Sequence, residues 1–422
     1  MQSPLKYIFL ILCAATLLAA APAFASDTRL SGFGTIGYAK SDQSFNYQRF
    51  INRSGTLKRD TVFGIQADTR FNPKWSATIQ AKLAPALNSD NRWQPTLSWA
   101  FLSYRPNNEW LMRAGKLRAP FYLQAENMDV GTTYSPARLP NELYSVSPTM
   151  DFNGASFVGT WMLDNSELSL DGYWGRAQTP WRTYHRDTSE SYWLLLNIEA
   201  RGLSLNWDHE ENIFRAGIHT ADLTRDDGLT FPVTMSQITS PGINGTYYPE
   251  QPYGEQRSKI TSPTFNFGVD LGWKHDFRTR GEYVRRTIKG MDSGPDTESY
   301  YLSLLKKAGK WTPYLTYARI MSNNLSVYQS VNNSQVSSAG APPFVIDAIN
   351  AGQRMAADSL SMYDQFSWAI GTSYAIDINS KIKAEWMIVN TGEVSSFVDA
   401  PAGEESGHRR INVFSLSYNF VF

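Results

Sequence analysis

The sequence predicts an all-β fold, a transmembrane antiparallel β-barrel of about 16 strands. Three observations lead to this fold class: an export signal at the start, an alternating aromatic strand at the end, and a polar average between them. Aromatic residues make up 14% of the 422 residues, yet the mean hydropathy is −0.37. After residue 25 the sequence has no run of about 18 apolar residues, so we expect no membrane-spanning helix. Only helices and closed barrels satisfy every backbone polar group in lipid, so a closed barrel is the membrane-spanning fold that the sequence still allows.

The first 25 residues have the pattern of a signal peptide, which leaves residues 26–422 as the barrel. Lys6 gives a positive start, an apolar stretch follows, and Ala23-Phe24-Ala25 has the small-x-small form of a cleavage site. The single cysteine, Cys13, lies inside this segment. The mature chain would therefore have no cysteine, which excludes disulfides, thiolate metal sites and cysteine nucleophiles.

The charge balance excludes one class of partner. The chain has 39 basic and 39 acidic residues and a formal net charge of zero. A protein that binds nucleic acid through phosphate contacts usually carries a basic surplus, so no nucleic-acid partner is expected.

The final strand, residues 411–422, alternates between large apolar and small or polar side chains. The apolar set is Phe414, Leu416, Tyr418, Phe420 and Phe422. This period of two indicates a strand with one apolar face, and the alternative is an edge strand of a soluble β-sandwich. The pattern resembles the C-terminal sorting strand of bacterial outer-membrane β-barrels. The resemblance implies that barrel-insertion machinery reads these five side chains, that the strand closes the barrel against residues 28–40, and that the barrel lies among outer-membrane lipid and lipopolysaccharide.

The remaining strands follow from the same alternation and from the turn residues between them. The expected strands are 28–40, 61–71, 75–82, 95–105, 110–117, 152–163, 167–175, 190–209, 211–217, 264–275, 279–288, 300–306, 311–320, 365–376, 381–391 and 411–422. Short turns such as 72–74 should be periplasmic and the longer polar connections extracellular. The register of 190–209 is uncertain, and a split there would give about 18 strands. A barrel of this size leaves an aqueous lumen.

Regular alternation stops between residues 118 and 150. This segment contains four prolines and many aromatic and charged residues. A connection of this length is usually functional or disordered, and its aromatic content argues against disorder. By strand count it is the third extracellular loop.

Three short motifs at this loop resemble the Gram-negative outer-membrane porin family. They are Gly115-Lys116-Leu117-Arg118-Ala119-Pro120, Met128-Asp129-Val130-Gly131 and Ala137-Arg138-Leu139-Pro140-Asn141-Glu142-Leu143-Tyr144. Ala119 departs from the larger aliphatic residue expected there. The resemblance implies a barrel of about 16 strands whose third loop folds inward and narrows a channel for passive diffusion of small hydrophilic solutes and ions. It also makes a homotrimer an expected assembly.

The same resemblance implies a set of pore-lining residues. Loop residues would face basic groups of the wall, and the set is Lys82, Arg113, Arg118, Glu126, Asp129, Arg138 and Glu142. Opposed acidic and basic rings select solutes by pore width and by electric field. The alternative for each residue is a salt bridge that pins the loop to the wall, above all for Arg118 and Glu142.

Catalytic and metal-binding motifs are missing from the sequence. It contains no HExxH, no GxSxG and no glycine-rich phosphate loop. His209 beside two glutamates, and Asp226-Asp227-Gly228, are more typical of ordinary turns than of metal sites. We therefore expect no enzyme and no cofactor. A barrel enzyme of lipase or protease type and a loop-mediated adhesin stay as alternatives, and the preferred solute stays open.

Overall fold

A computed structural model of the chain describes residues 27–147, 150–249, 255–291, 294 and 296–422. The expected signal peptide, 1–25, lies outside the described residues. None of the helices among the described residues is long and apolar enough to cross a membrane.

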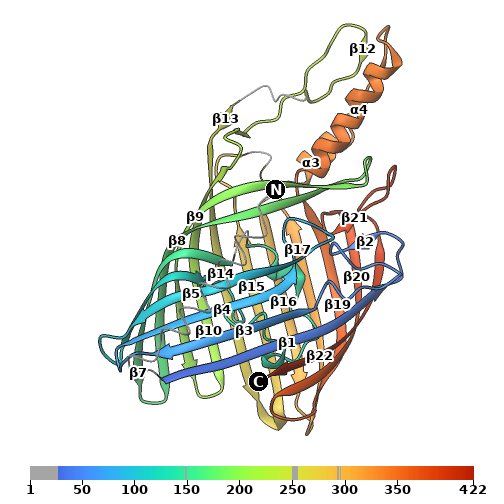
Figure 1. Cartoon of the computed structure of the whole chain (residues 1–422). Helices are drawn as coiled ribbons and strands as arrows, with labels where there is room; N and C mark the ends of the chain where they lie inside the picture. The colour runs from blue at the N-terminus through green and yellow to red at the C-terminus, as the bar shows by residue number, and fades with distance from the viewer. Residues whose placement is uncertain (1–26, 148–149, 250–254, 292–293, 295) are drawn as a thin grey trace.

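The described residues form a closed antiparallel barrel of sixteen strands (Figure 1). Every strand pairs with its neighbours in sequence, so the topology is a simple meander. The barrel strands are β1 (Asp27–Ser41), β3 (Val62–Arg70), β4 (Trp75–Pro85), β5 (Trp93–Tyr104), β6 (Trp110–Arg118), β7 (Asp151–Leu163), β8 (Ser166–His185), β9 (Glu190–His209), β10 (Asn212–Arg225), β14 (Lys259–Trp273), β15 (Phe277–Arg286), β16 (Thr297–Lys306), β17 (Trp311–Ser322), β19 (Tyr363–Ala375), β20 (Ser380–Ser395) and β22 (Arg410–Val421).

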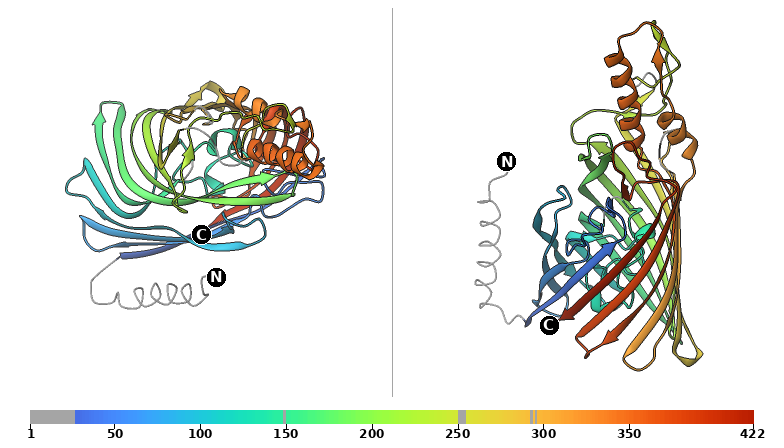
Figure 2. Two further views of the ribbon diagram at one scale, coloured as in Figure 1. Left: turned by 90° about the horizontal axis from the view of Figure 1, so that it is seen from above. Right: turned by 90° about the vertical axis from the view of Figure 1, so that its right-hand side faces the viewer.

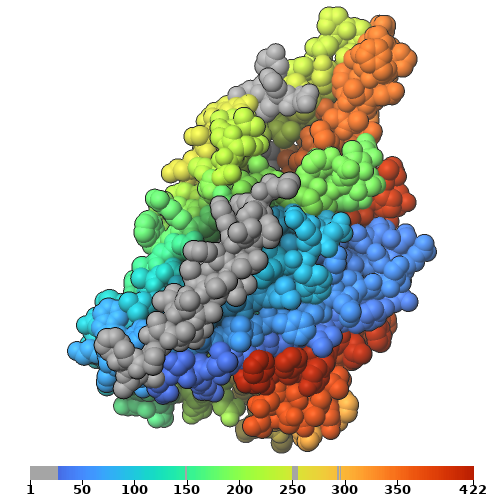
Figure 3. Space-filling view, viewed as in Figure 1, coloured from blue at the N-terminus to red at the C-terminus, as the bar shows by residue number. Residues whose placement is uncertain are grey.

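The last strand closes the barrel against the first, as predicted. Thr35 pairs with Asn419 and Tyr38 pairs with Leu416 in the β1–β22 ladder. The two strands meet as a continuous surface, blue against red in Figure 3. Gly32 and Gly34 lie under the rings of Phe422 and Phe420, and a Cβ atom at either glycine would come within 2.5 Å of a ring carbon. The glycines of β1 therefore make room for the aromatic face of β22.

The predicted alternation of faces is confirmed. Leu416 is 51% exposed on the outer face, whereas its neighbour Ser417 is 4% exposed on the inner face. Ile65, Trp273 and Phe414 are likewise exposed. The outside of the barrel is an apolar belt suited to lipid, and the inner face is polar.

One hairpin is longer than the sequence pattern predicts. Strands β8 and β9 have twenty residues each and pair without interruption from Ser166↔His209 to His185↔Glu190. The expectation of a strand limited to 167–175 is therefore wrong, and 190–209 does not split. The outward residues above Gly175 are polar, Arg176 and Gln178 among them, so the apolar alternation that marks a membrane strand is lost although the ladder continues.

The ends of the barrel differ. Short turns join the strands at one end, including η3 (Lys274–Asp276), and long loops join them at the other, which we call the loop end. The connection expected at about 224–263 is shorter, because β10 reaches Arg225 and β14 begins at Lys259.

The connection expected as an irregular loop at 321–362 contains two helices, α3 (Leu325–Asn332) and α4 (Pro343–Asp358). They project beyond the loop end together with residues 226–249 of the connection between β10 and β14 (Figure 2). Short two-stranded sheets tie the loops to one another: β2 (Asn46–Tyr47) with β21 (Val398–Asp399), β11 (Phe231–Pro232) with β13 (Gln256–Arg257), and β12 (Ile243–Asn244) with β18 (Ser337–Ser338).

Candidate functional site: the lumen and its inner loop

The segment after β6 folds into the barrel, as the family resemblance implied. We call residues 119–150 loop 3. Its described residues, 119–147 and 150, contain two short helices, η2 (Gly131–Thr133) and α2 (Asn141–Tyr144), and lie inside the ring of strands (Figure 2). Gly115, near the end of β6, takes a backbone conformation that suits glycine. Its φ is 136°, and a Cβ atom there would be 2.2 Å from the Ala100 carbonyl oxygen.

The first part of loop 3 lies against the wall formed by β10, β14 and β15. Arg215 donates to the carbonyl oxygen of Tyr122, and Asn266 donates to that of Phe121. The backbone N–H of Leu123 donates to Glu282 at 2.8 Å. Arg215 therefore points inward and holds the loop.

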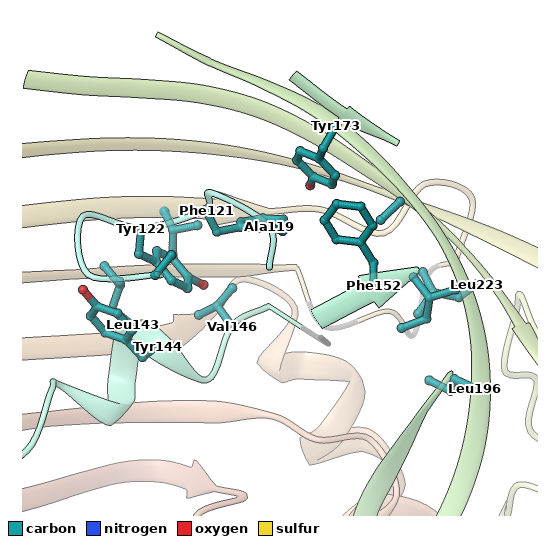
Figure 4. Close-up of a cluster of buried hydrophobic side chains, with 14 of the residues drawn as sticks. Ala119, Phe121, Tyr122, Leu143, Tyr144, Val146, Phe152, Tyr173, Leu196 and Leu223 are labelled. Atoms are coloured by element: carbon teal, nitrogen blue, oxygen red, sulfur yellow. The ribbon is translucent and has the colours of Figure 1, made fainter. Parts of the chain in front are cut away.

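A buried apolar cluster fixes this part of the loop. Phe121, Tyr122 and Tyr144 of loop 3 pack near Phe152 and Tyr173 of the wall (Figure 4). The Phe152 and Tyr173 rings are 5.1 Å apart, and those of Tyr122 and Tyr144 are 4.8 Å apart. Burial of each such ring stabilises its position by about 1.5–3 kcal/mol. The aromatic content of the segment therefore serves to pack the loop against the wall.

The middle of loop 3 crosses to the wall near β1, β4 and β22. Asp129 accepts hydrogen bonds from Lys82 on β4 and from Arg118, each at 2.9 Å. Burial disfavours the charged Asp129 carboxylate, but the two cations outweigh it and hold its pKa well below the ordinary value. Nearby, a Cβ atom on Gly131 would meet the Asn419 side chain of β22.

The last part of loop 3 lies against β16, β17 and β20. Lys383 donates to the carbonyl oxygen of Pro136 at 2.8 Å, and the Tyr314 hydroxyl accepts from the backbone N–H of Ala137 at 2.9 Å. Ser299 donates to the carbonyl oxygen of Glu142 at 2.8 Å. The loop thus lines most of the inner circumference.

Three of the sequence-predicted site residues are buried at the loop–wall contacts. Arg118 is 3% exposed at its side chain and donates to Asp151 at 2.7 Å as well as to Asp129. Arg138 makes a two-point ion pair with Asp60, at 2.8 and 2.5 Å. Glu142 is 1% exposed. Arg118 and Arg138 thus form pinning salt bridges of the kind considered as the alternative, whereas the Glu142 carboxylate accepts a hydrogen bond from Gln365.

The other four predicted residues form two contacts between loop and wall. One is the Lys82–Asp129 pair already described. The other joins Arg113 on β6 to Glu126, at 3.7 Å, where the Glu126 side chain is 65% exposed. An acidic loop group thus faces a basic wall group at the open part of the lumen.

The walls that loop 3 leaves uncovered enclose a cavity of about 360 Å³. Its lining residues come from β3 to β6 and the turns beside them: Gln66, Asp68, Arg70, Asn72, Pro73, Lys74, Trp75, Ser76, Thr78, Trp99, Phe101, Ser103, Arg105, Leu111 and Arg113. Of these, only Arg113 was among the predicted site residues. The alternation of 61–71 already places Arg70 on the inner face, so the sequence could have indicated this one cavity residue.

The tip of the β8–β9 hairpin crosses the loop end of the barrel. We call residues 177–195 the strap, because in the described ladders β8 pairs with β7 only up to Arg176 and β9 pairs with β10 only from Leu196. In Figure 2, viewed from above, the strap passes over the opening. It reaches the loops beside β19, β20 and β22, which lie on the opposite side of the barrel.

Two arginines of the strap pair with carboxylates of neighbouring loops, and Arg354 of α4 pairs with Asp187 of the strap at 2.6 Å. Arg182 pairs with Asp399 at 2.7 Å and with Asp90 at 3.2 Å. Arg186 pairs with Asp358 at the end of α4, at 2.9 Å, and with Glu405 at 2.6 Å. Burial raises the pKa of Asp358 to about 6, although Arg186 works in the opposite direction. No sequence signal distinguished these residues from an ordinary polar turn.

The described residues contain no group of three or more histidine, cysteine, aspartate or glutamate side chains arranged to hold a metal ion. Asp227, in the Asp226-Asp227-Gly228 turn, pairs instead with Arg225 at 2.6 Å.

Comparison with known proteins supports the fold. No protein-family model and no curated protein sequence matches the chain. Among solved structures, a loop L8 deletion mutant of the outer-membrane protein OmpT of Vibrio cholerae has a TM-score of 0.53 at 12% identity, covering 94% of this chain and 100% of that one. A trimer form of in-vitro folded OmpT has a TM-score of 0.52 at 12% identity, with the same coverage.

A third similar structure is the anion-selective porin from Comamonas acidovorans. Its TM-score is 0.51 at 9% identity, over 94% of this chain and 100% of that one. At these identities the likeness concerns the fold. The chain folds as a porin-like outer-membrane β-barrel, a closed multi-pass meander of sixteen strands among the described residues.

Proposed function

We propose that this protein is a channel for passive diffusion of small hydrophilic solutes and ions across the outer membrane. The observation that carries the proposal is the polar inner face, narrowed by a loop that is pinned to the wall and leaves one side open. A sixteen-stranded wall is wide enough for an aqueous passage. Charged groups at the opening, such as the Arg113–Glu126 pair, would set its selectivity.

Conductance across a planar bilayer tests the proposal. The purified folded protein should give stepwise ion conductance, and the same sample after heat denaturation should give none. Swelling of liposomes in small neutral sugars should show the passage of uncharged solutes. A folded protein without conductance would refute the channel function and favour one of the alternatives.

Projecting loops give a reason to keep the adhesin as a second candidate. Helix α4 extends away from the barrel and exposes Phe344, which is 72% accessible. Removal of residues 339–352, which spares the strap partners Arg354 and Asp358, should leave conductance unchanged if the barrel is a channel. Loss of cell attachment in that variant, with conductance absent in the full chain, would favour the adhesin.

The assembly and surroundings belong to the same proposal. The exposed apolar belt would contact outer-membrane lipid and lipopolysaccharide, and the β22 side chains from Phe414 to Phe422 would be read by insertion machinery. A homotrimer would bury part of this belt, in line with the trimer form described for OmpT. Chemical cross-linking in native membranes tests the trimer. The proposal involves no catalytic step and no cofactor.

A further inference from the structure

The cavity that loop 3 leaves open has an unbalanced charge. Four of its lining residues are basic, namely Arg70, Lys74, Arg105 and Arg113, and one is acidic, namely Asp68. The Asp68 carboxylate accepts hydrogen bonds from Gln66 and Thr78, which are neutral. The cavity lining therefore carries three more positive than negative side chains.

The arginines of this cavity differ from the other inward-facing arginines of the barrel. Arg70 and Arg105 donate side-chain hydrogen bonds to no acceptor in the described part of the chain, and Arg113 makes one ion pair, with Glu126 at 3.7 Å, but no side-chain hydrogen bond. By contrast, Arg278 and Arg280 both hydrogen-bond Asp270. Arg278 and Arg280 are thus tied to the wall, whereas Arg70 and Arg105 keep free donors and Arg113 makes only the long contact with Glu126.

An apolar surface lies beside the free donors. Trp99, Phe101 and Leu111 line the same cavity, and the Arg113 guanidinium carbon is 5.5 Å from the centroid of the Phe101 ring. Guanidinium groups bind carboxylates with two parallel hydrogen bonds, and an aromatic wall accepts a flat apolar group. A volume of about 360 Å³ falls within the usual range for small-molecule sites, roughly 300–1,000 Å³.

We propose that this cavity is a binding site for small organic carboxylates on their way through the lumen, and that it makes the channel anion-selective. The carboxylate would lie toward Arg105 and Arg113, and the apolar part toward Trp99 and Phe101. This inference rests on the proposed channel function. It adds a substrate class that conductance alone does not establish.

Ion selectivity of the reconstituted protein gives the first test. In a salt gradient of potassium chloride, the ratio of chloride to potassium permeability should exceed one for the unaltered protein. The double variant R105E/R113E should lower that ratio severalfold, and R105Q/R113Q should lower it less. The matched control is R176E, because Arg176 is 74% exposed at its side chain and lies on the outer face.

Defined solutes give the second test. Benzoate should reduce the chloride current more than acetate at the same concentration, and benzylammonium should not reduce it. The R105Q/R113Q variant should lose the benzoate effect, while resistance of its barrel to unfolding in detergent shows that it folds. Normal conductance with cation preference, or equal effects of benzoate and benzylammonium, would overturn the inference and leave the channel intact. Absence of conductance would overturn both.

Discussion

The strap is held across the barrel mouth mainly by its two arginines. Their removal should release it, because the remaining Arg354–Asp187 pair is partly exposed and contributes at most about 1 kcal/mol. Of the two strap arginines, Arg186 makes the more deeply buried attachment. Its side chain is 4% exposed and donates to Asp358, Glu405 and Asn332 at 2.9, 2.6 and 2.8 Å. Removing one partner of a buried ion pair typically costs about 3–5 kcal/mol, because the other charge is left uncompensated.

The exposure of the two carboxylates places the expected cost of removing Arg186 near the lower end of this range, about 3 kcal/mol. Glu405 is 53% exposed, so its pair contributes little, up to about 1 kcal/mol. Asp358, 11% exposed, is the buried partner, and it can take up a proton when Arg186 is absent. We therefore expect R186A to weaken the closed strap by about 3 kcal/mol, roughly a hundredfold in the ratio of closed to open. The double variant R182A/R186A also loses the Asp399 pair and should release the tip.

The distance between two spin labels measures the release of the strap directly. The only cysteine, Cys13, lies in the expected signal peptide, so T188C and A402C give unique sites, one on the strap and one on the connection between β20 and β22. The distance distribution between them should be narrow in the parent and broad in R182A/R186A. The control is R176A, which loses only an exposed pair with Glu199. A narrow distribution that survives the double substitution would refute the reasoning.

Three other variants test other parts of the structure. R138A leaves the buried Asp60 carboxylate unpaired, so loop 3 should loosen by about 3 kcal/mol and single-channel conductance should become larger and noisier; an unchanged trace would contradict the pinning role. The pKa of Asp358 is about 6 in the closed strap and should return to its ordinary value when the strap is released. Protonation of Asp358 therefore favours closure most at low pH, and this contribution is lost as pH rises through 6. The label distances should broaden between pH 5 and pH 7.5, and D358N should abolish this change. G115A places a Cβ against a carbonyl oxygen and should lower barrel stability by about 1–3 kcal/mol in thermal unfolding, whereas G228A, whose Cβ meets nothing within 4 Å, should cost less.

The strands that meet lipid could be predicted almost residue by residue. A membrane strand must alternate apolar and polar faces, so Phe414 to Phe422 and the pair 61–71 and 75–82 reveal both their structure and their orientation. The strap escaped prediction because its strands lie beyond the apolar belt. There the outer face meets water, and alternation no longer carries a signal. Helix α4 was missed for a related reason, since a segment outside the barrel wall follows no period of two.

The predicted site residues were brought to the lumen, but their roles depended on contacts distant in sequence. Arg118 meets Asp151, Arg138 meets Asp60, and Glu142 accepts a hydrogen bond from Gln365. Nothing in the loop sequence reveals these partners, because they come from strands and loops elsewhere in the chain. Whether an arginine pins the loop or stays free follows from the presence of a carboxylate beside it.

The sequence alone determined the wall: an antiparallel barrel, closed by its last strand, with an irregular segment after residue 118. Alternation is a local property, and lipid imposes it on every strand. Only the tertiary structure decided which part of the lumen stays open. Loop 3 packs its aromatic residues against β7, β8 and β15–β17, and its Asp129 pairs with Lys82 of β4. Arg70 of β3 and Arg105 beside β5 stay without a hydrogen-bond partner among the described residues, and Arg113 of β6 makes only the long pair with Glu126.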